Sequence, residues 1–265
     1  MKKTLIFSLI SLMFLFISGC IPKTNPPTQG NTPVFVDHFE NKTNNENQYT
    51  STFYGETIDS IRNISFVNGK VEKGVHLDAL NSYICYSTQY LNPTEGTIKF
   101  YFKPNSDYQL TYYDSTTMNN RFEAFLLDTV GWLEAFSGGF SNVMLFGVDQ
   151  NTQEKIINMI FGTWSGYSWS YAIAESITLP TDQFTEIAVI WNKTEGKIKL
   201  YLNGIKVAEN DYNTDLNNGE LFFIGQNPFG QKYYGMAYWP YGPHAMMGTY
   251  DELEIYDVDI YKLPG

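Results

Sequence analysis

Residues 186–210, EIAVIWNKTEGKIKLYLNGIKVAEN, decide the fold. The first six residues are largely apolar on both faces, which is typical of a central strand. In 197–202 apolar residues alternate with polar ones, the period of a half-buried strand. Asn203-Gly204 follows, the strongest short hairpin signal, because both central residues take positive φ. The stretch predicts a buried strand followed by a β-hairpin.

Other segments extend this pattern outward. In 97–104 the apolar residues Ile98, Phe100 and Phe102 share one face of a predicted strand. One stretch, 121–136, instead has apolar residues spaced as in a short helix, namely Phe122, Phe125, Leu126, Val130, Leu133 and Phe136. No second linker interrupts 34–265, so we expect one domain there. The predicted class is all-β, a two-sheet antiparallel β-sandwich with one short helix near 121–136.

The order of these segments resembles that of the LamG-like, concanavalin A-type jelly rolls of lectins and glucanases. The matching stretches are FVNGKVEKGVHLD at 66–78, NSYICYS at 81–87, TIKFYFKP at 97–104, the hairpin at 186–210, LFFIG at 221–225 and MGTYDELEIY at 247–256. The resemblance implies a jelly-roll fold and carbohydrate binding. The stretch 105–183 departs from the pattern, which leaves the ligand-facing loops open.

Composition excludes several classes of protein. The chain has 265 residues with 28 acids and 17 bases, for a net charge of −11. Nucleic-acid binding is excluded because it calls for a basic stripe. The 2 cysteines exclude a disulfide scaffold and a Cys-rich zinc site. Of these two, Cys85 lies in a strand-like run and is interpreted as a small buried hydrophobe.

The N-terminus has the anatomy of a signal peptide. Two lysines precede an apolar run at 5–17, which is shorter than the roughly 20 residues of a membrane-spanning helix. Ile17-Ser18-Gly19-Cys20 resembles the lipobox of bacterial lipoproteins, which implies that Cys20 carries the lipid. We therefore expect a signal peptide at 1–19, a lipidated tether rich in Pro, Thr and Asn at 20–33, and a place in the cell envelope outside the cytoplasm. The alternative is an ordinary secretory signal.

No complete catalytic motif is present. Related jelly-roll glycosidases carry an E-x-D-x-E strand, and the nearest feature here is Glu252, Glu254 and Tyr256, which lacks the third carboxylate. The alternative for the two glutamates is a solvated outer face. We therefore expect no enzyme.

Three acids are candidates for a structural calcium. Asp37 shares a face with Phe35 and Phe39, and Asp251 shares one with apolar residues of the last strand. Buried carboxylates need partners, and calcium prefers oxygen ligands. Asp37, Glu40 and Asp251 could therefore bind Ca²⁺ where the first and last strands meet; the alternative is that they accept backbone N–H groups in turns.

Two aromatic clusters are candidates for ligand binding. The segment 233–244 has too much Gly and Pro for a strand, and its rings could stack on sugars; they are Tyr234, Tyr238, Trp239, Tyr241 and His244. The second cluster, at 163–171, contains Trp164 and Trp169. These two have opposite parity in a single strand and would then lie on different faces, and core packing is the favoured interpretation there.

Three functions follow. The first is a membrane-anchored, non-catalytic carbohydrate-binding protein. The second is a structural or adhesive envelope module that binds a surface protein. The third is a glycoside hydrolase or polysaccharide lyase of the same fold. Fold alone does not choose among them.

Overall fold

Strands dominate the computed structural model of the chain. The structure describes residues 32–40, 51–53, 56–58, 61–79, 81–105, 112–114, 119–130, 140–149, 156–164, 169–214, 216, 221–225 and 244–262. In this part of the chain, the only helical element is a single 3₁₀ turn, η2 (Thr88–Tyr90). None of the described residues form a helix long and apolar enough to span a membrane.

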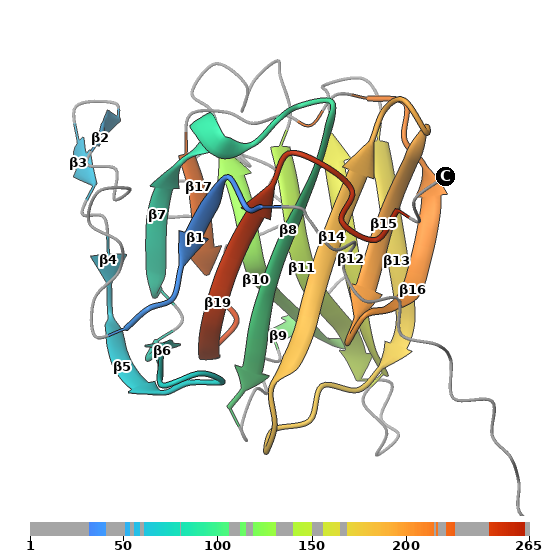
Figure 1. Cartoon of the computed structure of the whole chain (residues 1–265). Helices are drawn as coiled ribbons and strands as arrows, with labels where there is room; N and C mark the ends of the chain where they lie inside the picture. Colours follow the sequence, from blue (N-terminus) through green and yellow to red (C-terminus); the bar gives the residue numbers. More distant parts are fainter. Residues whose placement is uncertain are drawn as a thin grey trace, which may run out of the picture.

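The strands form two large sheets that face each other (Figure 1). The first, sheet A, has the order β16 (Ile205–Asp211), β15 (Lys197–Leu202), β14 (Thr185–Asn192), β8 (Glu95–Pro104), β19 (Gly248–Tyr256), β6 (Lys73–Leu77) and β5 (Ile64–Asn68), with β1 (Phe35–Asp37) on β19. The second, sheet B, has the order β13 (Trp169–Ile177), β12 (Ile156–Trp164), β11 (Phe140–Asp149), β10 (Asn119–Val130), β17 (Leu221–Gly225), β7 (Tyr83–Ser87) and β4 (Ile61–Arg62), with β9 (Tyr112–Asp114) and β18 (His244–Ala245) on β10. A separate pair joins β2 (Ser51–Phe53) to β3 (Glu56–Ile58). The predicted all-β, two-sheet sandwich is confirmed.

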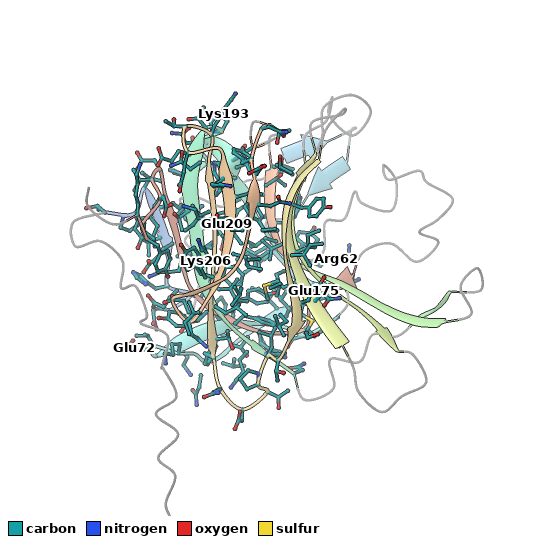
Figure 2. The ribbon with its side chains drawn as sticks, turned by 90° about the vertical axis from the view of Figure 1, so that its right-hand side faces the viewer. Arg62, Glu72, Glu175, Lys193, Lys206 and Glu209 are labelled. Atoms are coloured by element: carbon teal, nitrogen blue, oxygen red, sulfur yellow. The ribbon has the colours of Figure 1, made fainter. Side chains whose placement is uncertain are left out.

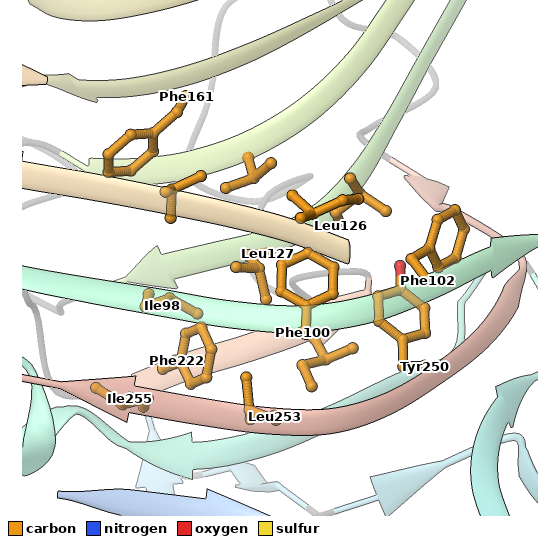
Figure 3. Packing of buried hydrophobic residues seen from close by; sticks show 14 of the residues in the cluster. Ile98, Phe100, Phe102, Leu126, Leu127, Phe161, Phe222, Tyr250, Leu253 and Ile255 are labelled. Atoms are coloured by element: carbon orange, nitrogen blue, oxygen red, sulfur yellow. The ribbon is translucent and has the colours of Figure 1, made fainter. Parts of the chain in front are cut away.

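Alternating residues of the two sheets form the core between them. In β8, Phe100 and Phe102 are fully buried, as the sequence predicts, and both contact the ring of Tyr250 in β19. Sheet B contributes Leu126, Leu127 and Phe222 from the opposite layer (Figure 3). Burying side chains of this size contributes about 1.5–3 kcal/mol each, so this layer is the main source of stability.

The predicted hairpin and central strand are also confirmed. β15 and β16 are joined through Asn203 and Gly204, which have φ of 49° and 72°. β14 lies between β8 and β15, and its outer residues Ala188 and Ile190 are buried as well. The reason is that the chain beyond β19 folds back over them, where Ile260 and Tyr261 complete a small second cluster.

The helix expected near 121–136 is wrong for its described part, because Asn119–Val130 is the strand β10. The register of β10 against β11 shifts between Phe125 and Leu127, which marks a β-bulge. A bulge inserts one residue and so reverses the alternation of faces beyond it. Two strand segments with opposite alternation imitate the three- and four-residue spacing of a helix. Residues 131–136 lie outside the described part.

A second bulge lies in β19. Along one edge, β19 pairs first with β6 and then with β1. Its register against β8 shifts between Asp251 and Glu254, and Glu252 has φ of 50°. Because of this extra residue, Tyr250 and Leu253 both face the core although they are three positions apart. Asp251 pairs with Tyr101, which lies on the outer face between Phe100 and Phe102, so Asp251 is not on the inward face of Leu253 that the sequence predicts.

Candidate functional site

The two tryptophans of the second aromatic cluster lie opposite each other. The strands β12 and β13 form an antiparallel pair in which Trp164 is the register partner of Trp169. Directly paired residues of neighbouring strands lie on the same face of a sheet. The expectation of opposite faces assumed one continuous strand and is wrong, because the chain turns between the two residues.

Buried neighbours show which face this is. In β12, Phe161 and Thr163 are buried, and in β13 the alternate residues Ser170 and Ala172 are buried. Phe161 and Ala172 belong to the core between the sheets. The residues between them, on the outer face of sheet B, are Gly162, Trp164, Trp169 and Tyr171. Core packing, the favoured interpretation of this segment, is therefore wrong for these positions.

Tyr171 is the exposed member of this set. Its exposed fraction is 41%, unusually high for an aromatic residue in a strand, and it pairs with Gly162. Gly162 pairs with Asn142 of β11, and Asn142 pairs with Asp128 of β10. Aromatic residues at the β12–β13 turn thus lie next to a row that contains an amide and a carboxylate. We call Trp164, Trp169, Tyr171, Asn142 and Asp128 the aromatic face.

The outer face of sheet B is covered toward its other edge. There, Tyr83, Cys85, Leu221 and Phe223 form a buried cluster of their own. The rings of Tyr83 and Phe223 meet edge to face, with centroids 5.7 Å apart. Burial raises the pKa of the Cys85 thiol to about 12, which confirms that Cys85 is a small buried hydrophobe. Only the part over β11 to β13 therefore remains as the aromatic face.

The other aromatic segment leaves and rejoins one edge of β10. On this edge β10 pairs with β17 up to Leu127 and Ile224, and then with β18, where Ala124 is the partner of His244. Residues 226–243 therefore form a loop with both ends on the same strand, a common arrangement for functional loops. Four of the predicted ligand residues lie outside the described part, namely Tyr234, Tyr238, Trp239 and Tyr241.

The two aromatic clusters start from opposite ends of the sandwich. Trp164 pairs with Phe140, and the next residue, Ser141, pairs with Thr129 of β10. His244 pairs with Ala124, five residues away along β10. At about 3.3 Å per residue, the two clusters begin about 17 Å apart along this strand. The predicted ligand residues thus belong to two separate regions.

The three candidate calcium ligands are held by hydrogen-bond donors. Asp37 is buried, as its parity predicts, and its two carboxylate oxygens accept the Phe39 N–H and the Tyr86 hydroxyl, each at 3.0 Å. Since β1 belongs to sheet A and β7 to sheet B, the bond to Tyr86 joins the two layers. Glu40 accepts the N–H of Lys73 at 3.3 Å.

Asp251 is fully buried beneath the turn that joins β5 to β6. Its Oδ2 accepts the N–H groups of Lys70 at 2.6 Å and Val71 at 2.8 Å, and its Oδ1 accepts that of Glu252 at 2.9 Å. A Cβ on Gly69 would lie 2.5 Å from Oδ2, so this approach needs glycine. Burial raises the pKa of Asp251 to about 6, although the backbone donors act in the opposite direction.

No group of three or more His, Cys, Asp or Glu residues in the described part of the chain is arranged to hold a metal ion. The carboxylates of Asp37, Glu40 and Asp251 each accept backbone N–H groups, as the alternative interpretation expects. A calcium at this position stays a prediction.

The glutamates of the last strand are paired rather than solvated. Glu252 contacts His38 at 2.9 Å and Glu254 contacts Lys99 at 2.6 Å, and their side chains are 14% and 18% exposed. Glu254 also accepts the Tyr256 hydroxyl. Nearby, Tyr101 donates to Glu186 at 3.0 Å, and burial, together with that carboxylate, raises the pKa of its hydroxyl well above the usual range. All of these groups lie on the outer face of sheet A, the layer opposite the aromatic face.

Sequence reasoning missed Tyr171, Gly162, Asn142 and Asp128 as members of the candidate site. The available signal was Ser165-Gly166-Tyr167-Ser168, a short polar stretch with a glycine between two tryptophans, which is compatible with a hairpin turn. The row from Gly162 to Asp128 depends on register across three strands and has no local signal. The predicted lipidation residue, Cys20, lies outside the described part.

Comparisons with known proteins agree with this architecture. The family model of the concanavalin A-like lectin/glucanases superfamily matches residues 78–260. A search of curated proteins found no match.

Three similar solved structures illustrate the range of proteins with this fold. Domains LG4-5 of the mouse laminin alpha1 chain have 9% identity and a TM-score of 0.47, covering 68% of this chain and 40% of that chain. The binding domain of botulinum neurotoxin serotype D has 11% identity and a TM-score of 0.48, covering 86% and 49%. The CBM40 of Ruminococcus gnavus IT-sialidase, bound to alpha2,3 sialyllactose, has 12% identity and a TM-score of 0.44, covering 71% and 90%. The chain thus spans less than half the length of the first two structures.

Proposed function

The chain belongs to the concanavalin A-like lectin/glucanases superfamily, and from this premise we propose that it is a non-catalytic, lectin-like carbohydrate-binding protein. We further propose that Cys20 is lipidated and anchors the protein to a bacterial membrane, with the sandwich outside the cytoplasm. The tether at 20–33 would hold the binding domain away from the lipid surface.

The aromatic face is the observation that carries the proposal. Trp164 and Trp169 are register partners, and the exposed Tyr171 lies on the same face beside Gly162. Aromatic rings stack on the apolar faces of sugars, while nearby amides and carboxylates bind the hydroxyl groups. Asn142 and Asp128 supply such groups in the row next to the rings.

The loop at 226–243 is a second candidate for sugar contact. It carries Tyr234, Tyr238, Trp239 and Tyr241, and it begins at the other end of the sandwich. The two regions therefore make separable contributions, which single substitutions in each can distinguish.

A glycan array probed with the full chain in detergent micelles tests the proposal. We expect Tyr171→Ala to weaken binding at least tenfold if its ring stacks on the ligand, since one stacking contact contributes about 1.5 kcal/mol. Val207→Ala is the matched control, because Val207 is 38% exposed on β16 in the other sheet. Trp239→Ala measures the contribution of the loop. Full binding by both aromatic variants would refute the assignment of these rings.

The absence of catalysis is part of the proposal. Glu252 and Glu254 are engaged by His38 and Lys99, and they lie on the layer opposite the aromatic face. We expect no hydrolysis or lyase activity on polysaccharides that bind. Cleavage that is lost in Glu254→Gln, with binding retained, would establish an enzyme instead.

The membrane anchor is tested separately. Cys20→Ser should release the protein from the membrane fraction, and globomycin should block its processing. An unchanged distribution in both experiments would contradict lipidation and leave the glycan-binding proposal intact. An array without any bound glycan, combined with a captured surface protein, would favour the adhesive alternative.

A further inference from the structure

The charged residues are divided unequally between the two sheets. Every lysine in the described part of the chain lies on a strand of sheet A or in a segment next to one; these are Lys70, Lys73, Lys99, Lys103, Lys193, Lys197, Lys199, Lys206 and Lys262. The strands of sheet B contain no lysine. The two outer faces of the sandwich therefore differ in charge.

Lysines of sheet A are largely neutralised by acids on the same layer. Lys199 contacts Asp259 at 2.9 Å and Glu195 at 2.6 Å, and Lys197 contacts Asp211 at 2.8 Å. Opposite charges at these distances leave little net field at the surface. Sheet A thus balances its own charge.

The strands that carry the aromatic face have no such balance. From β10 to β13, the only base is Arg121, while the acids are Glu123, Asp128, Asp149 and Glu175. Arg121 lies toward the far end of the sheet, since its partner Val148 pairs with Ile156, the first residue of β12, whereas Trp164 is the last. The base is therefore well removed from the aromatic rings.

Two of the acids lie close to the rings in the sheet. Asp128 is in the register row of Gly162 and Asn142. Glu175 is exposed, four residues beyond Tyr171 on β13, and Figure 2 shows it on the layer opposite Lys206 and Glu209 of β16. An anionic sugar on this face would meet these carboxylates without a cation nearby.

We infer that the aromatic face selects uncharged glycans and discriminates against glycans that carry carboxylate or sulfate groups. This inference rests on the proposed glycan-binding function of the same face. The physical basis is that a neutral sugar uses stacking and hydrogen bonds only, whereas an acidic sugar adds repulsion and an unpaired anion. The net charge of −11 acts in the same direction at longer range.

The test is an array on which each neutral oligosaccharide is printed beside its sialylated, uronic-acid or sulfated counterpart. In about 20 mM salt, we expect the full chain to bind each neutral glycan about tenfold more tightly than its acidic partner. The difference should narrow to about threefold in 0.5 M salt, because the Debye length falls from tens of ångströms to a few.

Substitution of one acid tests the cause. Glu175→Gln should raise binding of the acidic glycans about two- to threefold in low salt and leave binding of the neutral glycans unchanged. Glu209→Gln is the matched control, because Glu209 is an exposed acid on sheet A, and it should change neither.

The outcomes separate the two proposals. Equal or tighter binding of acidic glycans in low salt, lost in Tyr171→Ala, would overturn the selectivity and retain the glycan site. A selectivity that salt and Glu175→Gln leave unchanged would overturn its electrostatic cause. Absence of binding to every glycan would overturn the proposed function itself.

Discussion

The buried carboxylate of Asp251 should make the stability of the protein fall as the pH rises through mildly acidic values. Burial holds the pKa of Asp251 at about 6 in the folded state, above its ordinary value of 3.8. The folded chain therefore binds this proton more tightly than the unfolded chain does. The contribution is fully present below about pH 3.8 and is lost as the pH rises through 6.

The size of the effect follows from the shift. One pKa unit corresponds to about 1.4 kcal/mol, so a shift of about two units changes the free energy of unfolding by about 3 kcal/mol. Asp251→Asn removes the titration while keeping the size of the side chain. Its amide group also faces the Glu252 N–H, donor against donor, which adds a cost that is independent of pH.

The assay is urea unfolding of both proteins between pH 4 and pH 7. We expect the stability advantage of the wild type over Asp251→Asn to shrink by up to about 3 kcal/mol across this range. Glu209→Gln is a control of opposite sign, because the hydrogen bond from Lys206 lowers the pKa of Glu209. For that variant the advantage of the wild type should grow with pH. A constant or widening advantage over Asp251→Asn would refute the reasoning.

Other predictions concern packing and the candidate ion. Gly69→Ala should lower the free energy of unfolding by about 2–3 kcal/mol, because its Cβ would lie 2.6 Å from the carbonyl carbon of Lys73. Gly196→Ala, which has open space but φ of 70°, should cost about 1 kcal/mol, and equal losses in the two would argue against the steric cause. Tyr86→Phe should cost about 1–3 kcal/mol in chemical unfolding by leaving the buried Asp37 without a donor; a neutral result would show that the bond between the layers contributes nothing. If calcium joins the first and last strands, EDTA should lower the midpoint of thermal unfolding, and an unchanged midpoint would remove that prediction.

The elements that were predicted correctly depend on local signals. The alternation in β8, the apolar β14 and the turn at Asn203-Gly204 are each readable within ten residues of sequence. The burial of Asp37 followed from the same alternation. Local periodicity is the primary signal of secondary structure, and here it was sufficient for the fold class.

The errors occur where distant parts of the chain determine the local geometry. The bulge in β19 coincides with the change of its neighbour from β6 to β1, strands that lie far away in sequence. The bulge in β10 concealed a strand within a helical spacing. Trp164 and Trp169 were separated by parity because the turn between them was not recognised. Alternation cannot locate an extra residue that tertiary pairing imposes.

The attachment of the loop 226–243 also bears on how this protein could diversify. Both ends of the loop are fixed on one edge of β10, at Ile224 and His244, while the paired strands on either side remain independent of its length. Lengthening a surface loop costs little, about 0.6 kcal/mol for each doubling. The segment is therefore a replaceable cassette, in which related proteins or a laboratory library could change length and composition without altering the register of the sandwich beneath it.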